Sequence, residues 1–179
     1  MDINLTLEQR LILINQYTIL EKLYPENESD YARKREILEN GYTLHYSDLV
    51  QNVYEEMSES QQREVLDILT MYRVMYFSLK ERSAQEKYKN KKIYFPGFDG
   101  NEETKLVSYT LWFIFKLDRF DELKREDSFG CYNTHHRTIE TYRKMLSYWN
   151  SLPNKNELND ENLDWLIKNS VYGTLENEQ

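Results

Sequence analysis

The stretch DGNEETKLVSYTLWFIFKLDRF, residues 99–120, decides the fold of this chain because its apolar residues point in every direction. Asp99 and Glu102 have the N-cap and N3 spacing of a capping box, which predicts a helix that begins near Gly100. A helix over about residues 101–117 carries apolar side chains almost all round, and such a helix is buried by its neighbours. The sequence therefore predicts a helical core around this segment.

Two other structures fit part of this segment less well. Residues 109–115 are aromatic and branched, as in a buried strand, but the cap, the length and the lack of turn residues favour a helix. A membrane span needs roughly 20 apolar residues, whereas this run is shorter and is bracketed by Lys105 and Lys116. We expect no membrane-spanning segment.

Further helix signals lie on both sides of the central segment. Thr6 with Gln9 and Ser58 with Gln61 repeat the capping-box spacing, and the helix after Ser58 has the clearest amphipathic pattern. The sequence predicts helices from Thr6 to Pro25, over residues 26–41 with Gly41 as a left-handed cap, from Ser47 to Met57, after Ser58, from Ile139 to before Pro153, and after Asn159.

Length and composition favour one all-α domain. A chain of 179 residues can bury a stable core, and 5 Gly with 3 Pro disfavour a β-sandwich rich in tight turns. We predict a single domain of about six to eight helices over residues 1–172, followed by a frayed acidic tail at 173–179. The single cysteine excludes an internal disulfide framework, and the N-terminus does not have the pattern of a signal peptide, so we expect a cytoplasmic protein.

The first predicted helix carries apolar residues on both of its faces. Ile12, Leu13, Tyr17, Ile19, Leu20, Leu23 and Tyr24 share a broad apolar face that also contains Gln9 and Gln16. Leu11 and Ile14 project from the opposite, polar face, where they would be exposed in a monomer. These two residues are therefore candidates for a subunit interface, with scattered surface apolar residues as the alternative.

Carboxylates gather around both ends of the central helix. Asp99, Glu103, Asp118, Asp121, Glu122, Glu126 and Asp127 lie there, and two carboxylates in unlike environments are what acid/base chemistry requires. Arg119 would be stabilised at the C-terminal end of the helix, where it could also contact an anion. A pocket beside Asp99, Glu103, Tyr109 and Arg119 is the candidate site for a ligand or a reaction. The alternative is a helix cap followed by a solvated, charge-rich loop.

Cys131, His135 and His136 lie within six residues of one another. Zinc binds these ligand types, and His45, Asp127 or Glu140 could complete a site. A buried small cysteine beside histidines that flank a helix start accounts for the same residues without a metal. The sequence therefore predicts no cofactor.

In a second candidate surface, basic side chains alternate with aromatic ones, as in proteins that bind single-stranded nucleic acid. It comprises Lys87, Tyr88, Lys89, Lys91, Lys92, Tyr94 and Phe95. The net charge of −8 opposes this prediction, because an acidic protein is repelled by the phosphate backbone. Nucleic-acid binding therefore ranks third among the functions we consider.

Several short motifs are distributed along most of the chain. They are QRLILINQY at 9–17, NGY at 40–42, FPGFD at 95–99 and KML at 144–146, with Tyr24-Pro25, Tyr31, Met71-Tyr72, Glu103, Tyr109, Arg119, Asn133, Glu140, Tyr142, Trp149 and Pro153. In these residues the chain resembles the bacterial YfbU family. The resemblance implies a cytoplasmic, multihelical protein and supplies no catalytic residue.

Together these patterns favour a self-associating, non-enzymatic interaction or regulatory protein, a homo-oligomer with or without another protein partner. An enzyme or small-ligand binder is the second hypothesis, and a nucleic-acid-binding regulator is the third.

Overall fold

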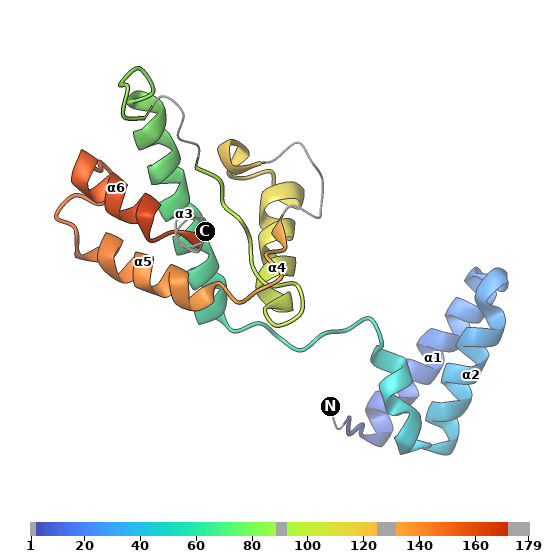
Figure 1. Ribbon diagram of the computed structural model, residues 1–179. Helices are drawn as coiled ribbons and strands as arrows, with labels where there is room; N and C mark the ends of the chain where they lie inside the picture. The colour runs from blue at the N-terminus through green and yellow to red at the C-terminus, as the bar shows by residue number, and fades with distance from the viewer. Residues whose placement is uncertain (1–2, 89–92, 125–131, 172–179) are drawn as a thin grey trace. The chain divides into compact units, whose positions relative to one another are not determined.

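The computed structural model describes residues 3–88, 93–124 and 132–171. These residues form six α-helices, short 3-10 turns and one π-helical turn, and they include no strand, which confirms the predicted all-α class. The chain divides into two compact units, residues 1–56 and 57–179, each of which is described by itself (Figure 1). One domain over 1–172 stays a prediction, and the predicted tail at 173–179 lies outside the described residues.

The N-terminal unit is a pair of helices with two short turns. Helix α1 (Leu7–Leu23) begins in the predicted capping box, since the Gln9 amide donates to Thr6 Oγ1 at 3.2 Å and the Thr6 amide donates to Gln9 Oε1 at 2.9 Å. The 3-10 turn η1 (Pro25–Asn27) then leads into α2 (Glu28–Asn40), and η2 (Thr43–Val50) follows. The two helices pack along their length.

Polar side chains join α1 to α2. Arg10 donates from Nε to the Leu38 carbonyl at 2.8 Å and from a second nitrogen to the Glu39 carbonyl at 3.0 Å. These carbonyls belong to the last turn of α2, where the helix dipole favours a cation. Arg35 of α2 pairs with the buried Glu21 of α1 at 2.7 Å. The face of α1 that meets α2 is therefore partly charged.

The core of this unit is small. Three apolar residues, Ile37, Leu38 and Tyr46, are buried, and half-buried neighbours pack against them: Ile3, Leu5, Leu13, Ile14, Tyr17 and Leu49. The predicted helix from Ser47 to Met57 is wrong, since η2 ends at Val50. A short helix needs a packed face, and Val53 and Tyr54 are exposed.

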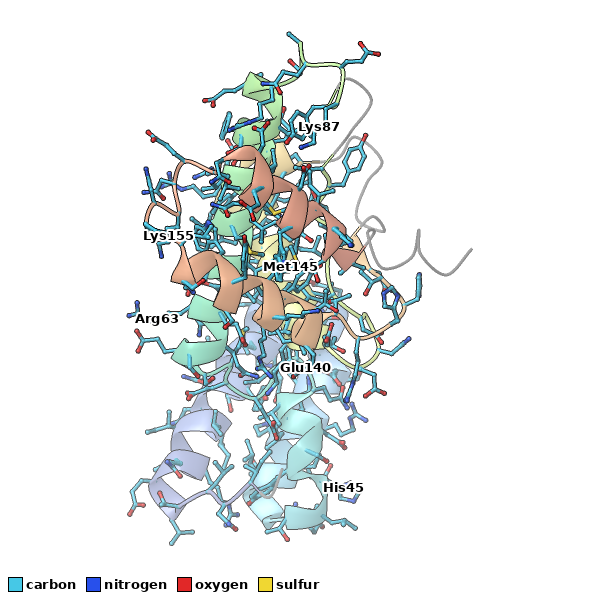
Figure 2. All side chains as sticks on the ribbon, turned by 60° about the vertical axis from the view of Figure 1, so that its left-hand side comes forward. His45, Arg63, Lys87, Glu140, Met145 and Lys155 are labelled. Atoms are coloured by element: carbon cyan, nitrogen blue, oxygen red, sulfur yellow. The ribbon has the colours of Figure 1, made fainter. Side chains whose placement is uncertain are left out.

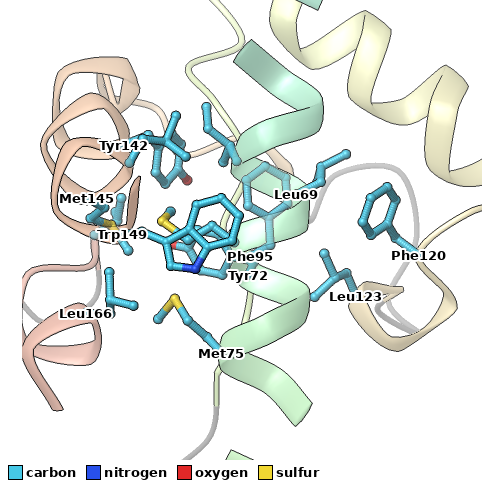
Figure 3. Packing of buried hydrophobic residues seen from close by; sticks show 14 of the residues in the cluster. Leu69, Tyr72, Met75, Phe95, Phe120, Leu123, Tyr142, Met145, Trp149 and Leu166 are labelled. Atoms are coloured by element: carbon cyan, nitrogen blue, oxygen red, sulfur yellow. The ribbon is translucent and has the colours of Figure 1, made fainter. Parts of the chain in front are cut away.

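The second unit is built around α3 (Glu59–Glu81). This helix contacts α4 (Thr104–Leu111), α5 (Ile139–Ser151) and α6 (Asp160–Lys168). Its buried face packs with residues of the surrounding elements, among them Phe95, Tyr142, Trp149 and Leu166 (Figure 3). The capping boxes predicted at Ser58 and the cap at Asn159 are both present.

The predicted central helix differs from its expected form. It begins at Thr104, not near Gly100, and after Leu111 it continues as the π-helical turn η3 (Trp112–Lys116). The prediction that it is buried on all sides is wrong, because 48% of Trp112 and 42% of Leu117 are exposed. The Trp112 ring stacks on Tyr109 with centroids 5.9 Å apart, so these rings cover each other at the surface. The helix that the others of this unit pack around is α3.

Candidate functional site

The buried carboxylate of Glu103 connects the FPGFD segment to the start of α5. Glu103 Oε2 accepts from the Asp99 amide at 2.9 Å, and Oε1 accepts from the amides of Thr138 at 3.1 Å and Ile139 at 3.0 Å. The Thr138 hydroxyl donates to Oε2 at 3.1 Å. Because α5 has no capping side chain of its own, the Glu103 carboxylate satisfies its first free amides and complements its dipole.

Asp99 and Glu103 do lie together, and Asp99 serves the local turn. Its Oδ1 accepts from the Asn101 amide at 2.9 Å. The expected capping box with Glu102 is wrong, since Glu103 reaches the Asp99 amide while Glu102 pairs with Arg137 at the surface at 2.9 Å. Both buried carboxylates therefore hold backbone amides in place.

The turn at Gly97 is tied to two other segments. The Phe98 amide donates to the Tyr132 carbonyl at 3.0 Å, and the Thr134 amide donates to the Phe98 carbonyl at 3.1 Å. The Gly97 carbonyl accepts from the Tyr142 hydroxyl at 2.7 Å, and it lies 3.2 Å from the Thr138 hydroxyl, whose single hydrogen it shares with Glu103. Burial raises the pKa of Tyr142 well above its ordinary value, so the phenol stays protonated in this bond.

The other two residues of the predicted pocket, Tyr109 and Arg119, have contacts that do not include these acids. Tyr109 packs against the rings of Trp112 and Phe113, and Arg119 is exposed after the end of η3. In the described residues no hydrogen bond or ion pair joins either of them to Asp99 or Glu103. A ligand pocket formed by these four residues stays a prediction.

Two of the predicted metal ligands, Cys131 and Asp127, lie outside the described residues, as does Glu126 of the acidic cluster. The His135 amide donates to Asn133 Oδ1 at 3.0 Å, and His136 Nδ1 lies 2.7 Å from the Thr134 carbonyl. Two residues proposed to complete the site, His45 and Glu140, belong to different units and are labelled in Figure 2. Within the described residues no group of three or more His, Cys, Asp or Glu is placed to hold a metal ion.

Part of the predicted nucleic-acid surface is used for packing. Lys87, labelled in Figure 2, pairs with Asp164, and the rings of Tyr88 and Phe95 are buried. Tyr94 is 43% exposed. The three other lysines of the stretch, Lys89, Lys91 and Lys92, lie outside the described residues.

The N-terminal unit carries the largest share of exposed apolar side chains. Ten of the fourteen large apolar residues that are exposed in the described chain lie within residues 1–56, against three of the 26 buried ones. Of the two interface candidates, Leu11 is 58% exposed, whereas Ile14 packs against the small core. The expectation that Ile14 would be exposed in a monomer is therefore wrong.

Sequence reasoning missed the more extensive exposed face of α1. Ile12, Ile19 and Leu23 belong to the broad apolar face of the sequence pattern, yet they are 57%, 56% and 64% exposed. The helix instead turns Arg10, Ile14 and Glu21 toward α2. No local pattern reveals this rotation, because the partners of Arg10 and Glu21 are 28 and 14 residues away.

The comparisons with known proteins identify the family of this chain. None of the described helices is long and apolar enough to cross a membrane. The YfbU domain profile matches residues 3–168. The UPF0304 protein MJECS11 of Methanocaldococcus jannaschii is 37% identical over 153 residues, which cover 82% of this chain and 88% of the relative. Since that organism is an archaeon, the family is not confined to bacteria, contrary to the expectation from the sequence. A match of this extent shows that the chain belongs to the YfbU family.

Proposed function

We propose that this chain is a non-enzymatic interaction protein that self-associates through its N-terminal unit. The observation that carries the proposal is the concentration of exposed apolar side chains in residues 1–56, a unit whose described residues include three buried apolar ones. Small units bury a smaller fraction of their surface than large ones and are only marginally stable by themselves. Association with a partner would remove the exposed side chains from water and supply the missing burial.

The polar residues of the second unit support a structural role. The buried carboxylates of Asp99 and Glu103 accept hydrogen bonds from backbone amides that would otherwise be unpaired. A catalytic acid or base has to present its carboxylate to a substrate, and these two are engaged inside the protein. We also propose a cytoplasmic location, for which the use of a single cysteine in 179 residues is the support.

The test is the mass of the purified full-length chain in solution. Sedimentation equilibrium from micromolar to submillimolar concentration should give a mass above that of one chain, and native mass spectrometry should give an integral multiple of it. High salt should not dissociate the oligomer, because an apolar interface is not screened. A single-chain mass at every concentration would contradict the proposal.

A further inference from the structure

One exposed row of side chains on α1, which we call the α1 stripe, consists of Ile12, Gln16, Ile19 and Leu23. Their spacing of four, three and four residues places them on one face of the helix. Side chains that face α2, among them Arg10 and Glu21, lie roughly on the opposite side. All four residues of the stripe are exposed, and half-buried Leu13 and Leu20 border it. The α1 stripe is thus an apolar face without a partner in its own unit.

The spacing of the α1 stripe is that of a helix-pairing seam. Side chains that repeat at intervals of three and four pack into a facing helix as knobs into holes. A polar residue within such a seam fixes the register of the pair. Gln16 has this place, with Ile12 before it and Ile19 after it. Since an amide both donates and accepts, Gln16 can pair with its own copy across a two-fold axis.

The charges beside the α1 stripe determine the direction of pairing. Glu8, Asn15 and Lys22 follow one another at intervals of seven residues along one edge of the stripe. The opposite edge is formed by Leu13 and Leu20, so a parallel partner would bring apolar residues to Glu8 and Lys22. An antiparallel partner brings Lys22 to Glu8 and Asn15 to Asn15. Neither Glu8 nor Lys22 forms an ion pair with a described residue of its own chain.

We propose that the α1 stripe binds the α1 stripe of a second copy of this chain, antiparallel, with Gln16 near the two-fold axis. This inference rests on the proposed self-association and adds its surface, its partner and its geometry. The centre of the interface is then formed by Ile12, Gln16, Ile19 and Leu23, and not by Leu11 and Ile14 as the sequence suggests.

The first test compares two variants of the full-length chain. Ile12→Asn combined with Ile19→Asn should weaken the dimer at least about tenfold in its dissociation constant, since each places an amide where an aliphatic side chain packs. Leu11→Asn is the matched control, because Leu11 is as exposed as Ile12 but lies a quarter-turn away from the stripe. This variant should keep the wild-type mass. Far-ultraviolet circular dichroism confirms that each variant is folded.

The second test uses disulfide cross-linking to determine whether the two α1 helices run parallel or antiparallel. With Cys131→Ser in place to remove the native thiol, the Glu8→Cys and Lys22→Cys proteins are prepared separately, mixed under reduction and then oxidised. The mixture should yield a cross-linked dimer that neither protein yields alone, and Asn15→Cys should cross-link to itself. Thr18→Cys, on the other side of α1, is the control that should stay uncross-linked.

The outcomes separate this inference from the proposed function. A wild-type chain that is monomeric at every concentration contradicts both. An oligomer whose mass is unchanged by the Ile12 and Ile19 substitutions, or that dissociates with Leu11→Asn alone, leaves self-association standing and overturns the α1 stripe. Cross-linking of Glu8→Cys to itself with no mixed product would overturn the antiparallel geometry.

Discussion

At the scale of single residues, Gly97 marks a place where the chain leaves no room for a side chain. Its φ is +97°, and a Cβ there would lie 1.9 Å from the Tyr132 carbonyl oxygen. That carbonyl is held by the Phe98 amide and so has little freedom to move. We expect Gly97→Ala to lower the free energy of unfolding by roughly 3 kcal/mol or more, measured by urea denaturation.

Gly41 provides the matched control for this change. It also has a positive φ, of +68°, but a Cβ there would meet only the end of the Arg10 side chain, at 3.3 Å. We expect Gly41→Ala to cost about 1–2 kcal/mol, the ordinary cost of a left-handed residue with a side chain. Equal losses for the two variants would mean that the close approach to Tyr132 is not what constrains Gly97.

Tyr142 links the stability of the second unit to pH. Burial raises the pKa of its phenol, so the folded state favours the protonated form. The stabilisation is complete below the unfolded pKa of about 10 and is lost as the pH rises from there toward the higher folded value. We expect Tyr142→Phe to cost about 1 kcal/mol at pH 7, because its bond to the Gly97 carbonyl is lost.

Above about pH 10 the two proteins should converge in stability, because only the wild type has this phenol to ionise on unfolding. The measurement is the free energy of unfolding of both proteins from pH 7 to pH 11. A difference that stays constant over this range would show that the Tyr142 phenol is not the titrating group.

At the scale of elements, Glu103 replaces a local cap with a long-range one. Glu103→Ala would leave the buried amides of Asp99 and Thr138 without their acceptor, and we expect a loss of about 2–4 kcal/mol. Glu103→Gln keeps one acceptor oxygen and should lose less. Glu102→Gln is the control, since Glu102 makes only an exposed pair with Arg137, and should change stability by under about 1 kcal/mol. Thermal or urea unfolding gives all three values.

A functional role for the Glu103 carboxylate would produce a different result. In that case Glu103→Ala would retain wild-type stability or gain some, as happens when a residue is strained for the sake of a reaction. Such an outcome would support a ligand or reaction site beside Asp99 and Glu103.

The helices that the sequence predicts best are those whose signals are local. Thr6 with Gln9, Ser58 with Gln61, and Asn159 with Asn162 are close in the chain, and each cap is present. The spacing at Asp99 also suggested Glu102 as the capping partner. The structure uses Glu103 there, because one carboxylate can then serve the turn and α5, whose N-cap and first residue are 35 and 36 positions away. A local sequence pattern cannot predict hydrogen bonds to residues so far along the chain.

The rotation of α1 was beyond prediction for the same reason. On a helical wheel of α1, hydrophobicity alone favours burial of the broad apolar face that contains Ile12, Ile19 and Leu23. The structure instead turns toward α2 the side from which Arg10 caps the last carbonyls and Glu21 pairs with Arg35. Which side is buried depends on these long-range polar contacts.

At the scale of the whole molecule, the two units differ in how completely they bury their apolar residues. Within its described part, the second unit has 23 buried apolar residues and four large exposed ones. The described part of the N-terminal unit has three buried apolar residues and ten large exposed ones. Local stability follows local burial, so opening of α1 and α2 should cost less free energy than opening of α3. An interface on the N-terminal unit would raise that cost by mass action.

Amide hydrogen exchange of the full-length chain measures this difference directly. At a concentration where the wild type is a dimer, amides of α1 and α2 should exchange at least about tenfold faster in the Ile12→Asn, Ile19→Asn protein than in the wild type, because the variant loses the stabilisation that association gives. Amides of α3 and α5 should exchange at the same rate in both, since their core does not involve the α1 stripe. The Leu11→Asn protein should match the wild type throughout. Faster exchange across α3 as well would show that the variant has lost its fold as a whole, and equal exchange in α1 would show that association does not stabilise the N-terminal unit.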